Sequence, residues 1–188
     1  MDDARPGAGG TLLSAVRAAL MSHPEVRDAE AASIPELTAR PVAAVVTSGF
    51  VGAPELRKHV RARLGEDGAP DVVAILPELP RTQTRELNLA ELRDQLTAMP
   101  SVYRFLPPRS DLERWLAEVW SALLTQPEIG VRDDFLELGG DSLSATSVLT
   151  EIHSAYDVDV SLADFFELAT IERLAAVINS RRPQVGRR

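Results

Sequence analysis

Three prolines between residues 98 and 110 divide this chain more firmly than any other feature of its sequence. The stretch is AMPSVYRFLPPRS, and proline opposes helix continuation and biases the residue before it toward extended backbone. Such a stretch is typical of a semi-rigid linker. The charge changes at the same place, because residues 1–109 hold 14 acidic and 13 basic side chains, whereas residues 110–183 hold 14 and 5. We therefore expect two small domains, at 10–97 and 110–182, a linker at 98–109 and a disordered tail at 183–188.

The first half mixes two hydrophobic periods. Apolar residues recur at helical spacing after residue 11 and again after Pro54, while short valine-containing runs favour β-strands. The expected helices are 11–23, 53–64 and 89–96, and the expected strands are 28–35, 41–48 and 72–79. The order α-β-β-α-β-α predicts a small α+β lobe, in which a three-stranded sheet carries its helices on one face.

The second half shows only the helical period. A wide apolar stripe predicts a helix at 111–124. A second helix is expected at 142–156 with Leu143 among its inward residues, followed by a short segment capped by Ser161 and a final helix capped by Thr170. Four helices around one apolar core predict an all-α four-helix bundle.

The composition narrows the functional classes. A net charge of −8 and a pI near 4.9 argue against nucleic acid as the main partner, because phosphates repel an acidic surface. The apolar runs are shorter than the roughly 20 residues that a spanning helix needs, and the N-terminus MDDARPGAGG lacks the apolar core of a signal peptide. The chain has no cysteine, and its three histidines lie far apart in sequence, so we expect no disulfide and no metal site. These features favour a cytoplasmic protein without membrane attachment.

The motif DDFLELGGDSLSA at residues 133–145 carries the clearest chemistry. Gly139 and Gly140 permit a sharp turn, and Asp141-Ser142 then opens a helix. A serine there lies beside unpaired N–H groups and the positive end of the helix dipole, a setting that suits an attached phosphate. The plainer alternative is that Ser142 only caps the helix. A nucleophile elbow is disfavoured because position 144 is serine and not glycine, and a P-loop because Gly-Lys-Ser/Thr is missing.

The stretch FLELGGDSLSA, with a tryptophan-bearing helix before it and FFELATIERLA after it, resembles the peptidyl carrier (thiolation) domain of nonribosomal peptide synthetases. The resemblance covers about residues 110–182. It implies that a separate phosphopantetheinyl transferase attaches 4′-phosphopantetheine from coenzyme A to Ser142, with Asp141, Gly140 and Gly139 completing the motif. A carrier of this family performs no catalysis. It holds acyl groups as thioesters and presents them to an adenylation enzyme acting in trans and to condensation, thioesterase or tailoring enzymes of natural-product and antibiotic biosynthesis.

The first half has a likeness of its own. Its segments AVRAALMSHPEVRDAEAASIPE, RPVAAVV, APELRKHVRARL and DVVAILPELPRTQTRELNLAEL are similar to the small C-terminal subdomain of adenylation (acyl-adenylate-forming) domains. That family closes on a Pro-x-Thr…Gly-Lys run whose lysine contacts the acid and the ATP phosphates. If Pro80 and Thr82 match its first positions, Arg85 replaces the glycine and Glu86 replaces the lysine. A carboxylate reverses the sign of the interaction with phosphate, and the only lysine, Lys58, lies well upstream. The resemblance therefore implies a truncated and catalytically silent lobe.

Several alternatives stay open at this point. The silent lobe is a vestigial or rigid platform, a docking surface for an enzyme supplied in trans, or part of a chain cut from a longer synthetase. The acidic surface of the second half is merely solvated, or Asp133, Asp134, Glu137 and Asp141 steer basic partners toward the serine. Two other functions compete with the carrier: the C-terminal half of a split adenylating ligase fused to its carrier, and an interaction module whose serine is never modified.

Overall fold

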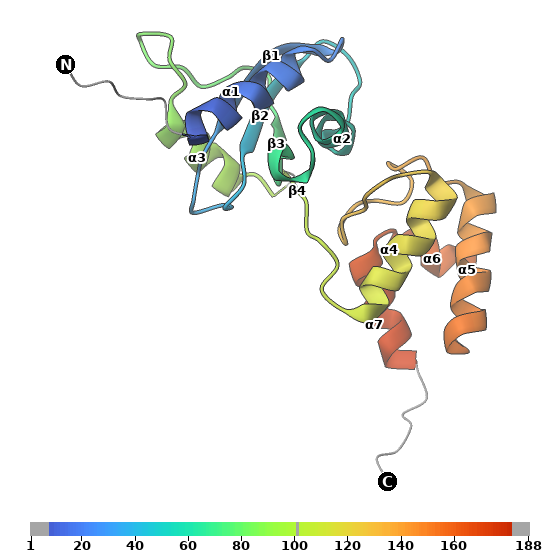
Figure 1. Cartoon of the computed structure of the whole chain (residues 1–188). Coiled ribbons are helices and arrows are strands. Elements are labelled where there is room, and N and C mark those ends of the chain that lie inside the picture. Colours follow the sequence, from blue (N-terminus) through green and yellow to red (C-terminus); the bar gives the residue numbers. More distant parts are fainter. Residues whose placement is uncertain (1–7, 101, 182–188) are drawn as a thin grey trace. The chain divides into compact units, whose positions relative to one another are not determined.

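The computed structural model describes residues 8–100 and 102–181. The chain forms two compact units and passes from one to the other between Arg104 and Phe105, within the stretch expected to be a linker. We call residues 8–104 the sheet unit and residues 105–181 the helical unit (Figure 1). The tail expected at 183–188 lies outside the described residues.

A mixed four-stranded sheet with the order β1-β2-β3-β4 lies at the centre of the sheet unit. β1 (Val26–Ala32) pairs antiparallel with β2 (Val42–Thr47), β2 pairs parallel with β3 (Val72–Ile75), and β3 pairs antiparallel with β4 (Tyr103–Arg104). The prediction of three strands is therefore wrong by one. The missed strand has only two residues, so it is too short to show an alternating hydrophobic pattern.

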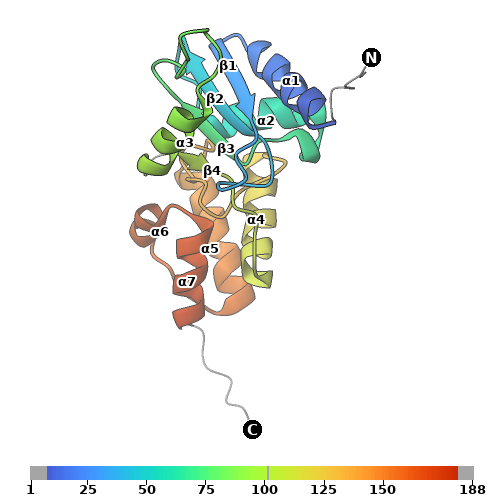
Figure 2. The ribbon, with the colours of Figure 1, turned by 90° about the vertical axis from the view of Figure 1, so that its left-hand side faces the viewer.

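Helices cover both faces of this sheet, and the prediction of one covered face is wrong. α1 (Ala8–Met21) and α2 (Ala53–Leu64) pack on one face, and α3 (Leu89–Ala98) packs on the other (Figure 2). Alternate residues of β2 point into the two apolar clusters that result. A strand buried on both faces is apolar at every position rather than at every second one, and the sequence shows that pattern. The buried residues of β2 are Val42, Ala43, Ala44, Val45 and Val46.

Local signals set the ends of the helices in the sheet unit. α2 carries Pro54 in its first turn and ends at Gly65, whose φ of 72° favours glycine. A short 3₁₀ turn (Glu66–Gly68) then leads toward β3. The Asn88 side chain accepts the Glu91 amide and caps α3.

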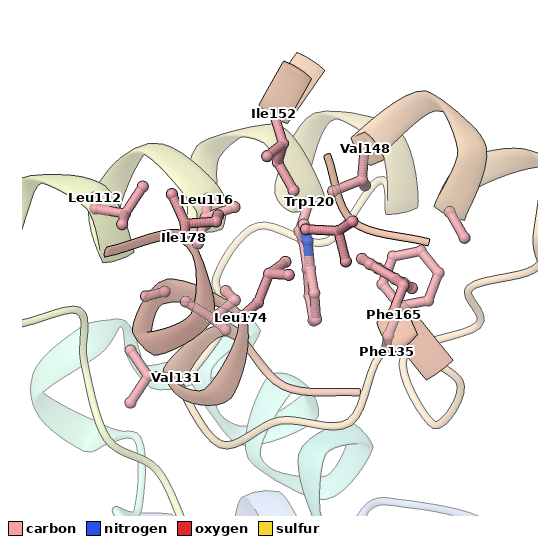
Figure 3. Packing of buried hydrophobic residues seen from close by; sticks show 14 of the residues in the cluster. Leu112, Leu116, Trp120, Val131, Phe135, Val148, Ile152, Phe165, Leu174 and Ile178 are labelled. Atoms are coloured by element: carbon pink, nitrogen blue, oxygen red, sulfur yellow. The ribbon is translucent and has the colours of Figure 1, made fainter. Parts of the chain in front are cut away.

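Four helices surround one apolar core in the helical unit. They are α4 (Asp111–Leu124), α5 (Ser142–Tyr156), α6 (Leu162–Leu168) and α7 (Ile171–Arg181). The connection between α4 and α5 adds its own buried side chains to this core, so it is packed rather than free. The largest buried side chains of the unit are Leu116, Trp120, Phe135, Ile152, Phe165, Ile171, Leu174 and Ile178. Figure 3 labels seven of them, all except Ile171.

Candidate functional site

Two successive glycines shape the turn before α5, and each is required for a different reason. Gly139 has a φ of 91°, a left-handed conformation that residues with a Cβ rarely adopt. Gly140 lies against Phe135: a Cβ added there would come within 2.3 Å of two ring carbons and 2.6 Å of the Phe135 carbonyl oxygen. The Gly140 amide donates to that same carbonyl over 2.9 Å. A larger residue would therefore strain the first position and clash at the second.

The ring beneath this turn belongs to an aromatic cluster at the centre of the core. Phe135 is fully buried and meets Trp120 and Phe165 edge to face, with ring centroids 4.8 and 4.9 Å apart (Figure 3). Such pairs contribute about 0.5–1.5 kcal/mol beyond the area that they bury. The Phe135 amide also donates to the Ala169 carbonyl over 2.9 Å, which ties the loop to the turn between α6 and α7. The core thus holds the glycine turn in place, a role of Phe135 that sequence reasoning missed.

Asp141, and not Ser142, caps α5. The Asp141 carboxylate accepts the Ser144 amide over 2.8 Å, and the Asp141 amide donates to Ser144 Oγ over 2.9 Å, which closes a reciprocal capping box. The Ser144 hydroxyl also donates to the carboxylate over 2.7 Å. Hydrogen bonds from the Ser144 amide and hydroxyl hold the pKa of Asp141 below its usual range. The interpretation of Ser142 as a mere cap is therefore wrong. The spacing of a capping box, with a polar partner three residues after the cap, could have revealed Ser144.

Ser142 is the exposed first residue of α5. Its carbonyl accepts the Thr146 hydroxyl over 2.7 Å, but its own hydroxyl makes no hydrogen bond with any residue that the structure describes. The neighbouring serines are engaged, because Ser144 closes the capping box and Ser147 Oγ donates to the Leu143 carbonyl over 3.1 Å. Ser142 therefore presents a free hydroxyl at the positive end of the helix dipole.

Two leucines near Ser142 are exposed. Leu143 is 78% exposed and Leu136 is 52% exposed, so the expectation that Leu143 points inward is wrong. The buried stripe of α5 is fixed by Ala145, Val148 and Ile152. Leu143 precedes the first of these by two residues, which is roughly 200° around a helix of 3.6 residues per turn. The apolar residue next to the serine is thus available for contact with another molecule.

The acidic residues expected around the serine divide into two groups. Asp133 is buried, and its carboxylate accepts the Gly130 amide over 2.8 Å. Asp134 is half-buried and accepts two amides of the following turn, over 2.8 and 3.2 Å. Only Glu137 and Asp141 of this set are exposed. Asp133 supports the loop from inside, so the charged surface beside the serine is smaller than the sequence indicated.

The sheet unit carries a second turn of interest, a hairpin closed by Arg81 and Leu87. The Thr82 amide donates to the Glu86 carbonyl over 2.8 Å, and the Arg85 amide donates to the Thr82 carbonyl over 2.9 Å. Arg85 has a φ of 66°, in the left-handed region that favours glycine. Both Arg85 and Glu86 are exposed. The hairpin therefore has the backbone shape of a glycine position while its side chains are an arginine and a glutamate.

Opposite charges attach this hairpin to β1. Arg81 donates to Asp28 over 2.9 Å and to Glu30 over 3.4 Å, and it also donates to the Arg85 carbonyl over 3.0 Å. The hydrogen bond with Asp28 raises the pKa of Arg81. Arg17 of α1 pairs with Glu30 as well, over 3.3 Å. One arginine thus connects the turn of the hairpin to β1.

The structure brings together two histidines that the sequence separates. The rings of His23 and His59 meet edge to face, with centroids 4.8 Å apart, and Arg63 lies 3.1 Å from His59 Nδ1. Even so, the described part of the chain contains no group of three side chains that could hold a metal ion.

Across residues 8–100 and 102–181, no helix combines the length and the apolar character that crossing a membrane requires.

Comparison with known proteins assigns each unit to a family. Residues 114–178 match the family model described as phosphopantetheine attachment site, so the helical unit is a carrier domain. Residues 15–86 match the model described as AMP-binding enzyme C-terminal domain. The chain therefore contains a carrier domain preceded by the C-terminal subdomain of an AMP-binding (adenylation) domain, and its curated relatives are peptide synthases.

The curated relatives are much longer than this chain. Tyrocidine synthase 3 of Brevibacillus parabrevis is 36% identical over 134 residues, which are 71% of this chain and 2% of the relative. Gramicidin S synthase 2 of Brevibacillus brevis is 34% identical over 124 residues, which are 66% of this chain and 3% of the relative. A solved complex of the phosphopantetheine transferase Sfp with coenzyme A and a peptidyl carrier protein matches at 34% identity and a TM-score of 0.40, over 41% of this chain and 100% of that chain. The chain thus spans 2–3% of the length of these two synthases.

Proposed function

We propose that Ser142 is the attachment point of 4′-phosphopantetheine and that the chain carries acyl or aminoacyl groups as thioesters in nonribosomal peptide, or hybrid, biosynthesis. One observation carries this proposal: the Ser142 hydroxyl is exposed and makes no hydrogen bond within the described residues, whereas Ser144 is bound in the capping box. The family match supports the same prosthetic group. When bound, that group supplies a terminal thiol on a flexible arm.

The attachment step needs a bare nucleophile and a base from outside the chain. Ser142 Oγ bonds to the β-phosphorus of coenzyme A while the phosphoanhydride bond breaks. Adenosine 3′,5′-bisphosphate leaves with the bonding electron pair, and the serine proton passes to a base of the transferase. The first-turn N–H groups and the dipole of α5 favour the phosphodiester that results. Gly139, Gly140 and Asp141 act by positioning the hydroxyl, so the chain is the substrate of this step and not its catalyst.

The exposed groups around the serine indicate what kind of surface the partners present. Leu136 and Leu143 offer apolar contact, and Glu137 and Asp141 add negative charge. Charge complementarity raises the rate of encounter more than it raises affinity. We therefore infer partner surfaces that are basic and partly apolar, first on a phosphopantetheinyl transferase and then on an adenylation enzyme in trans and on condensation, thioesterase or tailoring enzymes.

The sheet unit serves in this proposal as a platform or docking surface and not as an adenylating catalyst. If Pro80 and Thr82 match the first positions of the closing motif of adenylation domains, Glu86 stands where that family has lysine, and a carboxylate repels the phosphates of ATP. The Arg81 ion pairs hold the hairpin that carries Glu86 against β1. The only lysine, Lys58, lies in α2 and not in the hairpin. These features favour a silent lobe over half of a split ligase.

Intact-mass analysis tests the carrier role. The chain is incubated with coenzyme A and a phosphopantetheinyl transferase, and we expect the mass to rise by one phosphopantetheine group. Ser142→Ala should show no increase, because it removes the nucleophile. Ser144→Ala is the matched control, since it removes a serine from the same turn and should still be modified. An unshifted wild-type mass, or an equal increase in Ser142→Ala, contradicts the proposal.

ATP–pyrophosphate exchange tests the silence of the sheet unit. The chain is mixed with a separately expressed large lobe of an adenylating enzyme, and we expect no exchange above that of the large lobe alone. Exchange that depends on the chain and disappears in Glu86→Ala would instead favour the split ligase. Glu91→Ala, which removes another exposed carboxylate nearby in the sequence, controls for a general loss of charge.

A further inference from the structure

The proline-containing stretch between the two domains is held at both ends. On the side of the sheet unit, Val102 is buried in the cluster that α3 covers. Tyr103 and Arg104 form β4 and pair with β3. The Arg104 guanidinium also donates to the Leu96 carbonyl at the end of α3, over 3.1 Å. The chain is therefore part of the sheet unit up to Arg104.

On the side of the helical unit, the contacts begin at the next residue. The Phe105 ring lies against Gly130, since a Cβ added to that glycine would be 3.0 Å from a ring carbon. The Leu106 carbonyl accepts the Val131 amide over 2.8 Å, and the Leu106 side chain packs against the helical core. The two prolines that follow have φ fixed near −65°. The stretch thus has little freedom after Phe105.

An ion network completes the attachment. The Arg109 amide donates to Glu113 Oε2 over 2.7 Å, and its guanidinium donates to Glu113 Oε1 over 2.7 Å and to Glu172 Oε1 over 2.8 Å. Arg132 pairs with the other oxygen of Glu172 over 2.9 Å. Glu113 is 7% exposed, and a charge-assisted bond to a buried carboxylate is stronger than a surface ion pair. Arg109 therefore connects the proline stretch to both α4 and α7.

We propose that the junction of Arg104 and Phe105 is the pivot between the two units, and that residues 105–109 move as part of the carrier and not as a flexible linker. Hinges of this kind are a few residues at the ends of elements that absorb the change in φ and ψ. The proposal goes beyond thioester carriage, and it does not depend on whether Ser142 is modified. Arg109 is in this view the residue that keeps the stretch on the carrier.

The pivot changes how the carrier can search for partners. A free linker of the 12 residues at 98–109 would let its ends separate by a root-mean-square distance of about 20 Å if it were fully flexible. A stretch bound on both sides allows rotation about one junction, so the distance from the pivot to the serine stays constant. The carrier then swings along an arc, and its partners must present their sites on that arc.

Residual dipolar couplings of the full chain in a dilute alignment medium test the pivot. We expect the amide couplings of Phe105, Leu106 and Arg109 to fit the alignment tensor of α4–α7, and those of Tyr103 and Arg104 to fit the tensor of the sheet. The two tensors should differ. Couplings at 105–109 that are averaged and fit neither tensor would show a flexible linker and overturn the proposal. A single tensor for both units would overturn it as well, because the units would then not reorient.

A pair of variants tests the role of Arg109. In the wild type we expect amide order parameters of about 0.85 at Leu106 and at residue 109, as in a rigid backbone, and a fall below about 0.6 at residue 109 in Arg109→Ala. Arg114→Ala is the matched control, because it removes an arginine whose ion pair with Asp111 stays within the first turn of α4. Order parameters at residue 109 that do not change in Arg109→Ala, or that fall equally in Arg114→Ala, contradict this role. Unchanged spectra of α5 and α6, which make no ion pair with Arg109, exclude unfolding as the cause.

Discussion

The two units of this chain use their apolar side chains differently. The helical unit gathers Trp120, Phe135 and Phe165 into one core directly beneath the glycine turn. The sheet unit divides mainly aliphatic residues between two clusters on opposite faces of the sheet. Its hairpin is exposed, and the ion pairs of Arg81 attach it to β1. One candidate site therefore rests on a core, and the other lies at the surface.

This difference shows that the backbone conformation of a site and the side chains that carry its chemistry can vary independently. Gly140 is in contact with a buried ring, so a change at that position has a steric cost. Arg85 and Glu86 are exposed, and a change there meets no packed neighbour. The left-handed backbone at Arg85 persists without the glycine that favours it. Backbone shape alone is therefore weak evidence of activity, and the side chains decide it.

Removal of the central ring of the core should separate the two units most clearly. Trp120 is fully buried, and Trp120→Ala should lower the free energy of unfolding of the helical unit by about 3–5 kcal/mol. That is a large part of the roughly 5–15 kcal/mol that stabilises a typical domain. The sheet unit has cores of its own and should keep its transition. Urea titration followed by amide spectra of both units measures the two transitions separately.

The control for this comparison is the other tryptophan of the same helix. Trp115 is half-buried, so Trp115→Ala should cost the helical unit less than Trp120→Ala. If Trp120→Ala shifts the transition of the sheet unit as far as that of the helical unit, the two units fold as one and the comparison fails.

The glycine turn should show the next largest effect. Gly140→Ala places a methyl group against the Phe135 ring, and such overpacking costs about 1–3 kcal/mol. We expect a loss near the upper end of this range and slower attachment of phosphopantetheine, because the turn must move off the ring. Gly139→Ala, which has open space around its Cβ, should cost only the left-handed strain of about 1 kcal/mol. Equal losses in the two variants would contradict the steric role of Phe135.

Local signals predicted the helices well and the sheet less well. α2, α4 and α5 have the predicted bounds, because prolines, glycines and capping side chains fix their ends. β4 was missed because two residues carry no period, and its pairing depends on contacts with β3 far away in sequence. The continuous apolar run of β2 indicates a strand that is covered on both faces. Strand propensity alone does not distinguish such a strand from one that is covered on one face.

The role of Ser142 stays a prediction, and the structure adds details of its surroundings that the sequence did not reveal. The Gly-Gly-Asp-Ser order led to Ser142, and the serine hydroxyl is free within the described residues. The reciprocal bonds of Asp141 with Ser144 and the burial of Asp133 were missed. Both depend on the direction in which a short polar side chain points, and that direction follows from the packed turn and not from the order of residues.

Substitution of Arg85 by glycine in the hairpin should raise the free energy of unfolding, whereas substitution in the glycine turn should lower it. A left-handed backbone costs a residue with a Cβ roughly 1–2 kcal/mol. Glycine avoids this cost, but the larger conformational entropy of its unfolded state cancels part of the resulting gain in stability. The Arg85 side chain makes no hydrogen bond or ion pair within the described residues. Arg85→Gly should therefore raise the free energy of unfolding of the sheet unit by about 0.5 kcal/mol. Urea titration measures it, with Thr84→Gly as the control that should lower stability.

The smallest expected effect is a pH dependence confined to the sheet unit. His59 Nε2 lies 3.0 Å from Ser22 Oγ and 3.1 Å from the Ala19 carbonyl oxygen at the end of α1. Partial burial, followed by the charges of Arg63 and His23, lowers the pKa of His59 below 6.5. The unfolded chain then binds more protons than the folded chain just below pH 6.5. The contribution of His59 to the free energy of unfolding of the sheet unit is therefore complete above this pH. It is lost as the pH falls from 6.5 through the lower pKa of the folded state.

The free energy of unfolding of the sheet unit at pH 7.5 and 5.5 measures this effect. We expect a loss at pH 5.5 in the wild type and a smaller one in His59→Gln, which keeps a polar side chain at the end of α1 but does not titrate. His153→Gln should leave the pH dependence of the sheet unit unchanged, because His153 is an exposed residue of the helical unit. A wild-type loss that His59→Gln reproduces in full would assign the effect to other groups. The lowered pKa of His59 would then make no measurable contribution to the stability of the sheet unit.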